Sequence, residues 1–194
     1  MVVMVVDASL TLEGLWLAGT FFATPLPLEN YVGLLGKPTR TLSGPPAPYG
    51  HRNNQIHVYD TFGFYLNEDH ATGKIGEVTF VLDETRGTFP ISKPFQGKLE
   101  VGGVLFYPGM EEREYPTEAS IRFERVLPGR YKAESGDVAI YLTASKKKGP
   151  SNRRPVKQRS FVEVSIGFGV PTHIPDPQTH HSSSRQWQGH SHHG

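Results

Sequence analysis

One run of about eighty residues, from residue 24 to residue 106, constrains the fold of this chain most strongly. It opens with a helical pattern, because Thr24 suits an N-cap and Pro25 suits the first helical position. An apolar stripe with i, i+3, i+4, i+7 spacing follows and stops at Gly36, and its members are Leu28, Tyr31, Val32 and Leu35. This pattern predicts one helix over residues 25–35 that packs through its stripe.

Short segments that alternate apolar and polar residues predict strands in the rest of the chain. The composition agrees, since 21 Gly and 16 Pro accompany 11 Phe and 8 Tyr, as in folds of short strands joined by tight turns. The predicted strands cover residues 1–6, 9–17, 55–60, 63–66, 75–82, 98–106, 118–126, 130–133, 138–144 and 160–168. The predicted fold class is α+β: a mainly antiparallel β-sheet or sandwich of about nine to ten short strands with one packed N-terminal helix.

The chain divides into a globular part and a tail. Its length suits a single domain with a real core, which we place over residues 1–170. Residues 39–54 are rich in Gly and Pro and predict a surface loop. Residues 171–194 contain Pro, Ser, Gln and His with Ile174 as the single aliphatic side chain, so they are predicted to be a disordered His/Ser-rich tail.

Cysteine content and the first residues bear on where the protein works. The chain has no cysteine, which excludes disulfides, thiolate metal sites and cysteine nucleophiles. The apolar start, residues 1–6, is too short for a signal-peptide core or a membrane span. We expect a soluble, cytoplasmic protein with no membrane partner.

The charge is unevenly distributed. Seven basic residues and no acid lie in residues 146–159, so the rest of the chain is acidic although the net charge is +1. This basic segment predicts a hairpin connection between the last two strands. It has no interleaved aromatic residues on which bases could stack, which argues against a nucleic acid as the partner.

An acidic run over residues 110–118 is the most suggestive surface feature. It holds four carboxylates, a tyrosine and a methionine, and it could face a basic partner such as the phosphate-binding cleft of a nuclease toxin. The alternative is an ordinary solvated loop. The candidate partner-binding residues are Glu111, Glu112, Glu114, Tyr115 and Glu118.

Polar groups elsewhere are weaker candidates for chemistry. A cation site or a general acid and base could be built from Asp60, Glu68, Asp69 and His70. Turn formation accounts for the same residues, and the pair His51 and His57 is too small a ligand set for zinc. We therefore expect no catalytic residue, no metal ligand and no cofactor.

Three motifs resemble a known family. They are a helix ending Leu-Gly-Lys-Pro, an aromatic strand with Asp-x-x-Gly-x-Tyr, and the segment Pro-Phe-x-Gly-x-Leu-x-Val-x-Gly. Over residues 10–106 the chain resembles an uncharacterised bacterial α+β domain family found in toxin-rich gene neighbourhoods, where immunity proteins are also encoded. The resemblance implies a non-catalytic protein-binding module, most concretely an immunity protein that neutralises a cognate toxin by occlusion. The alternative is a small β-rich enzyme or ligand-binding domain whose polar residues converge only in three dimensions.

The tail yields the first testable prediction. Because residues 171–194 offer almost no apolar surface to bury, removing them should leave stability unchanged. Thermal melts of the full chain and of a chain truncated after Val170 should therefore agree. A clearly lower melting temperature for the truncated chain would show that the tail docks on the domain.

Overall fold

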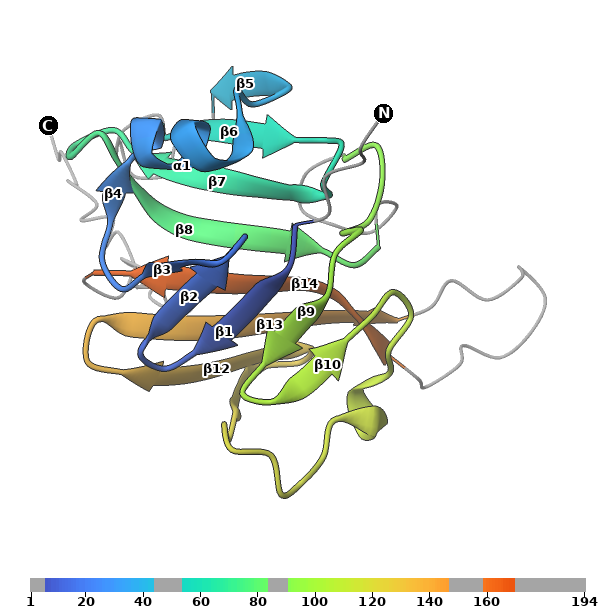
Figure 1. Ribbon diagram of the computed structural model, residues 1–194. Helices are drawn as coiled ribbons and strands as arrows, with labels where there is room; N and C mark the ends of the chain where they lie inside the picture. Colours follow the sequence, from blue (N-terminus) through green and yellow to red (C-terminus); the bar gives the residue numbers. More distant parts are fainter. Residues whose placement is uncertain (1–5, 44–53, 84–90, 147–158, 170–194) are drawn as a thin grey trace, which may run out of the picture.

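The computed structural model describes residues 6–43, 54–83, 91–146 and 159–169 (Figure 1). Within these ranges fourteen strands form two sheets, accompanied by one α-helix and one 3-10 turn. The predicted fold class is confirmed: the chain is mostly β, its larger sheet is antiparallel, and a short helix lies near the N-terminus. The strands outnumber the prediction because turns divide several predicted segments and because very short strands have no visible alternation.

The smaller sheet has five strands in the order β10-β9-β1-β2-β3. It is mixed, because β1 pairs in parallel with β9 whereas its other pairs are antiparallel. The strands are β1 (Ala8–Thr11), β2 (Gly14–Leu17), β3 (Thr20–Phe22), β9 (Leu99–Val101) and β10 (Val104–Phe106).

The larger sheet is antiparallel and follows the order β11-β12-β13-β14-β8-β7-β6-β5, with β4 added beside β8. The central strand β14 pairs with β13 on one side and with β8 on the other. The strands are β4 (Leu26–Pro27), β5 (Arg40–Ser43), β6 (Gln55–Tyr59), β7 (Phe64–Asp69), β8 (Lys74–Val81), β11 (Glu124–Leu127), β12 (Arg130–Ser135), β13 (Val138–Lys146) and β14 (Arg159–Phe168).

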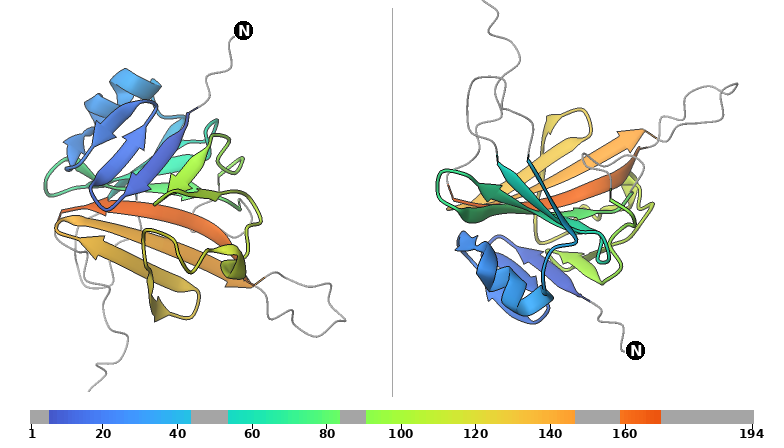
Figure 2. Two further views of the ribbon diagram at one scale, coloured as in Figure 1. Left: turned by 60° about the horizontal axis from the view of Figure 1, so that its bottom comes forward. Right: turned by 90° about the horizontal axis from the view of Figure 1, so that it is seen from above.

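The main core lies between the two sheets. Figure 2 shows the smaller sheet and the helix α1 (Leu28–Leu35) together on one side of the larger sheet. Inward-facing residues of both sheets join one apolar cluster, among them Leu10, Leu15 and Leu17 from the small sheet and Phe80, Val164 and Ile166 from the large one. Burying such side chains provides the main driving force for the packing of the sheets.

A second, smaller core covers the opposite face of the larger sheet. Val58, Tyr65 and Val81 on β6, β7 and β8 are each next in sequence to a residue of the main core, which places them on the other face. The members of this second core are Ile56, Val58, Tyr65, Val81 and Ile91, with the half-buried Leu42 packed against them. The large sheet is therefore covered on both faces over these strands.

The helix begins later than the sequence predicted. It starts at Leu28, and Thr24 does not cap it, because Leu26 and Pro27 stay extended and pair with β8. The physical reason lies in the two prolines. A residue that precedes proline is driven away from helical geometry, so helix formation is disfavoured until the chain has passed Pro27. The predicted helix over residues 25–35 is correct in its C-terminal eight residues only.

The helix packs through three of its four predicted contact residues. Tyr31 and Leu35 are buried, whereas Leu28 is half-buried against the core and Val32 lies outside both apolar clusters. The Tyr31 ring stacks on Phe22 of β3 with centroids 4.7 Å apart. Among the described residues no helix is long and apolar enough to cross a membrane.

The end of the helix is fixed by the sheet. Gly36 has a φ of +80°, as expected for a residue that stops a helix, and its N–H donates to the carbonyl oxygen of Val32. The hydroxyl of Tyr59 on β6 donates to the carbonyl oxygen of Gly36 at 3.0 Å. The start of the predicted loop over residues 39–54 is also extended, because residues 40–43 pair with β6 as β5.

One predicted strand is wrong over most of its length. Residues 118–126 were predicted as a strand, but pairing begins only at Glu124 in β11. The segment before it consists of turns and bends, and the Tyr115 hydroxyl donates to the carbonyl oxygen of Ile121 across it. This bend has consequences for the candidate site.

Several predictions concern residues that the structure does not describe. They include most of the strand over residues 1–6, the middle of the basic segment and the tail. The flanks of the basic segment do form the predicted hairpin, because β13 and β14 pair up to Lys146 and Arg159. The division into a domain over residues 1–170 and a tail over 171–194 stays a prediction.

The helix contact can be tested by a pair of truncations. Leu35→Ala should lower the free energy of unfolding by roughly 2–5 kcal/mol, because it leaves a cavity in the core. Val32→Ala should cost much less, since Val32 contributes to neither apolar cluster. Chemical denaturation of both variants measures the difference, and equal losses would contradict the packing described here.

Candidate binding site

The acidic run over residues 110–118 is attached to the first residues of β14 in the larger sheet. The buried side chain of Met110 begins the run, and its carbonyl oxygen accepts a hydrogen bond from the Phe161 N–H of β14 at 2.9 Å. Glu111 forms an isolated antiparallel bridge with Ser160, also on β14. The run therefore begins as a short extension of the sheet and is held in place by it.

A 3-10 turn, η1 (Glu112–Glu114), follows this attachment. It is closed by a capping box, in which the carboxylates of Glu111 and Glu114 each accept from the backbone N–H of the other. Glu111 also pairs with Arg113 at 2.7 Å, and the hydroxyl of Tyr107 donates to Glu114 at 2.7 Å. The carboxylates of Glu111 and Glu114 thus help to build the turn.

The far end of the segment is tied down as well. Ser120 donates to the carbonyl oxygen of Gly102 at 2.5 Å, and the hydroxyl of Tyr115 donates to the carbonyl oxygen of Ile121 at 2.7 Å. Gly102 has a φ of +55°, and a β-carbon there would collide with the Ile121 side chain. The loop between η1 and β11 is consequently held against the β9–β10 hairpin.

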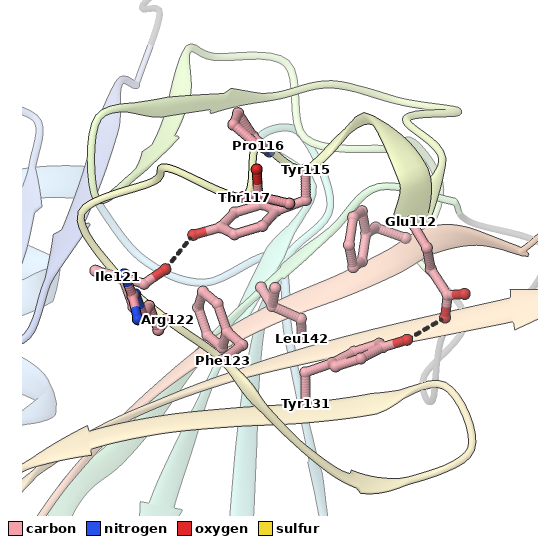
Figure 3. A pocket seen from close by; sticks show the side chains of 10 residues that line it. Glu112, Tyr115, Pro116, Thr117, Ile121, Arg122, Phe123, Tyr131 and Leu142 are labelled. Carbon is pink, nitrogen blue, oxygen red and sulfur yellow. Dashed lines mark hydrogen bonds between the residues drawn. The ribbon is translucent and has the colours of Figure 1, made fainter.

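Between this loop and the inner face of the larger sheet lies a pocket of about 490 Å³ (Figure 3). Its lining is mainly apolar and aromatic, with a few polar groups at the margins. The lining residues are Glu112, Tyr115, Pro116, Thr117, Ile121, Arg122, Phe123, Tyr131, Leu142 and Phe161. This size and this mixture of walls are typical of sites that bind a small molecule or the side chain of a partner.

The aromatic walls of the pocket are arranged as two edge-to-face pairs. Tyr115 and Phe123 have ring centroids 5.5 Å apart at 82°, and Tyr131 and Phe161 have centroids 6.5 Å apart at 69°. Such contacts favour a fixed ring orientation. The pocket is therefore formed by side chains that also brace one another.

Glu112 supplies the carboxylate of this pocket. The Tyr131 hydroxyl donates to its Oε1 at 3.0 Å, and the Arg159 guanidinium lies 3.9 Å from the same oxygen. Burial, followed by this hydrogen bond, raises the pKa of Tyr131 above its ordinary value. Tyr131 therefore stays protonated at neutral pH and acts as a donor to Glu112.

The five predicted contact residues lie on one stretch of surface but differ in their roles. Glu112 and Tyr115 line the pocket, whereas Glu111 and Glu114 are engaged within the turn. Glu118 is exposed, and its carboxylate accepts from the neighbouring Thr117 hydroxyl at 3.0 Å. That these residues bind a partner stays a prediction.

Sequence reasoning missed most of the pocket wall. Phe123, Tyr131, Leu142 and Phe161 fall in segments predicted as strands, where an aromatic or aliphatic residue indicates core. Alternation shows which face of a strand is apolar but not whether another element covers that face. The pocket forms where the chain bends after Tyr115, and no local sequence pattern predicts this bend.

A family model described as "Domain of unknown function (DUF7738)" matches residues 9–114. The chain belongs to this family. No curated protein and no solved structure matches the chain. The family match confirms the predicted relationship to a domain family of unknown molecular function, and its description states neither an activity nor a partner.

The DUF7738 match runs from β1 to the end of η1. It includes Glu111, Glu112 and Glu114 but stops before Tyr115 and Glu118. Apart from Glu112, every residue that lines the pocket follows the matched region. The DUF7738 region thus supplies the acidic turn, and the chain beyond it supplies the aromatic walls.

Of the other candidate groups, His57 and Glu68 meet each other, whereas Asp60 and Asp69 have partners elsewhere. Asp60 pairs with Arg40 through two hydrogen bonds of 2.8 and 3.1 Å, which is the main reason why its pKa lies below the ordinary value. His57 on β6 contacts Glu68 on β7 at 2.6 Å. Asp69 accepts hydrogen bonds from within its own turn, as expected for turn chemistry.

These pairs form no metal site. Within the described ranges no group of three or more His, Asp or Glu side chains could hold a metal ion. His51 lies outside those ranges. The two pockets described here are lined by neither Asp60, His57 nor Glu68.

A second pocket of about 380 Å³ lies where β7, β8, β13 and β14 meet, and it includes Glu77 in its lining. Burial is the main cause that raises the pKa of Glu77, while hydrogen bonds from Ser165, Thr79 and Asn67 oppose the shift. The Thr79 hydroxyl lies 3.4 Å from Glu77, and Ser165 lies 2.8 Å from Thr79. The charged form of Glu77 is thus disfavoured in the folded state.

This shift predicts a pH-dependent effect of Glu77→Gln. A pKa raised by folding makes a contribution to stability that is full below the ordinary value of 4.5 and is lost as the pH rises through the folded-state pKa. Glu77→Gln removes that loss and should raise the melting temperature at about pH 8 but not at about pH 4. Melts across this range measure the effect, and a variant that is equally or less stable at high pH would contradict it.

Proposed function

We propose that this domain is a protein-binding module and that its partner docks on the acidic turn and over the adjoining pocket. The observation that carries the proposal is the attachment of the turn to β14, which presents a preorganised acidic surface beside an open aromatic pocket. Preorganisation lowers the entropy lost on binding. Aromatic anchors surrounded by charged groups are also typical of protein interfaces.

The partner that suits this surface is basic. Residues 110–118 carry four carboxylates and one arginine, and the side chain of Glu118 is exposed. Complementary charge speeds the encounter between proteins and helps to select the partner. We propose that the partner is a toxin, such as a basic nuclease domain, and that the domain neutralises it by occlusion. This finer proposal draws on the resemblance of residues 10–106 to a family found beside toxin genes.

A second candidate function is favoured by the pocket alone. Its volume and aromatic lining would also suit a small-molecule ligand, with Glu112 and Arg122 as orienting groups. A domain of this kind would retain the ligand in the absence of any protein partner. Native mass spectrometry of the purified protein separates the two functions.

The protein-binding proposal is tested by charge reversal at Glu118. Glu118→Lys should slow association with the product of the adjacent gene several-fold and reduce its salt dependence, because steering by exposed charges is screened over about 10 Å. Reversals of Glu111 and Glu114 are less suitable, since both carboxylates build the capping box. Association rates at several salt concentrations, together with growth rescue on co-expression, provide the measurements.

Glu29→Lys is the matched control. Glu29 is exposed on α1, at the opposite end of the molecule from η1 (Figure 1). Its substitution by lysine changes the charge by the same amount as Glu118→Lys. It should leave the association rate close to that of the parent. Equal slowing by both variants would refute the acidic site, and an adjacent gene product that is not toxic would refute the toxin-neutralising role.

A further inference from the structure

We infer that the pocket beside η1 is an arginine-anchor site, which takes the guanidinium of one arginine side chain from the docked protein. The inference rests on the proposed function, because it names the group by which a basic partner would be held. It is carried by the composition of the pocket wall and by the hydrogen bonds of Glu112.

The first argument is the shape and character of the walls. Four aromatic rings surround the opening and leave room beyond what a single methyl or hydroxyl group would fill. A guanidinium is planar, is more weakly hydrated than an ammonium and stacks on aromatic faces. The walls therefore suit the end of an arginine side chain better than that of a lysine.

The second argument is the state of the Glu112 carboxylate. Its Oε1 accepts from Tyr131, and among the described residues no hydrogen bond reaches Oε2. Arg159 balances part of the charge, but at 3.9 Å it donates no hydrogen bond. The Glu112 carboxylate is partly exposed, and a guanidinium that reached it would donate a charge-assisted hydrogen bond to Oε2.

The third argument is the distribution of charge around the opening. Figure 3 places Glu112 at one end of the pocket and Arg122 at the other. A cationic side chain would point toward the Glu112 end, which adjoins the rest of the acidic turn. Arg122 is exposed and can donate to a backbone carbonyl of the same partner segment. The two ends together fix one direction for the bound segment.

The test uses a short peptide in place of the partner. The probe is acetyl-Gly-Arg-Gly-amide, and its control carries citrulline, which has the same shape and no charge. Titration of the full chain followed by NMR should show shifts at residues 112–123 and at Tyr131 and Phe161. The arginine peptide should bind about tenfold more tightly than the citrulline peptide, because only it can form the charge-assisted bond.

Two variants locate the effect. Glu112→Gln should weaken binding of the arginine peptide about tenfold and leave the citrulline peptide unchanged. Glu29→Gln, which removes an exposed carboxylate on α1 that does not line the pocket, should leave both affinities within about twofold because an exposed charge contributes little. If Glu112→Gln does not fold, the comparison of the two peptides on the parent protein still decides the question.

Two results would overturn the inference: equal affinity for both peptides, or shifts that fall outside the pocket or are absent. Failure of the proposed function would look different. The arginine peptide would then bind as described while the adjacent gene product would not. Conversely, a protein partner that binds equally well to the parent and to Glu112→Gln would leave the proposed function standing without the arginine anchor.

Discussion

The hydrogen bond from the Phe161 N–H to the carbonyl oxygen of Met110 is the interaction on which the candidate site depends. It joins the start of the acidic run to β14, the strand that pairs with both β13 and β8. Without this attachment, residues 110–118 would be the solvated loop that a charged segment usually forms. With it, the turn is anchored to the first residues of β14, which also pair with β13.

The attachment also separates the roles of neighbouring carboxylates. Glu111 and Glu114 accept hydrogen bonds from backbone N–H groups at the two ends of η1, so these carboxylates stabilise the turn. Glu112 faces the pocket, and Glu118 faces solvent. A run that looks uniform in the sequence therefore divides into structural and available groups. This division determines which substitutions report on binding and which report on folding.

Much of the fold could be predicted from the sequence, and the candidate site could be predicted only in part. Alternation identified β8 and β14, and the stripe ending at Leu35 identified the helix, because both patterns reflect burial of one face. The start of the helix was misplaced because the effect of Pro27 on Leu26 outweighed the capping signal of Thr24. The pocket was missed because its walls come from segments far apart in the chain, and their meeting depends on the bend after Tyr115.

The central claim is that the acidic turn is fixed to β14 and that the pocket beside it is preformed. Native-state hydrogen exchange at the Phe161 amide tests this claim most directly, because that amide donates to Met110 in the turn. The account predicts exchange as slow as that of amides in the middle of β14, since both would open only with the core. Exchange of the Phe161 amide that is orders of magnitude faster than that of the Val164 amide would show that the turn detaches on its own, and would contradict the account.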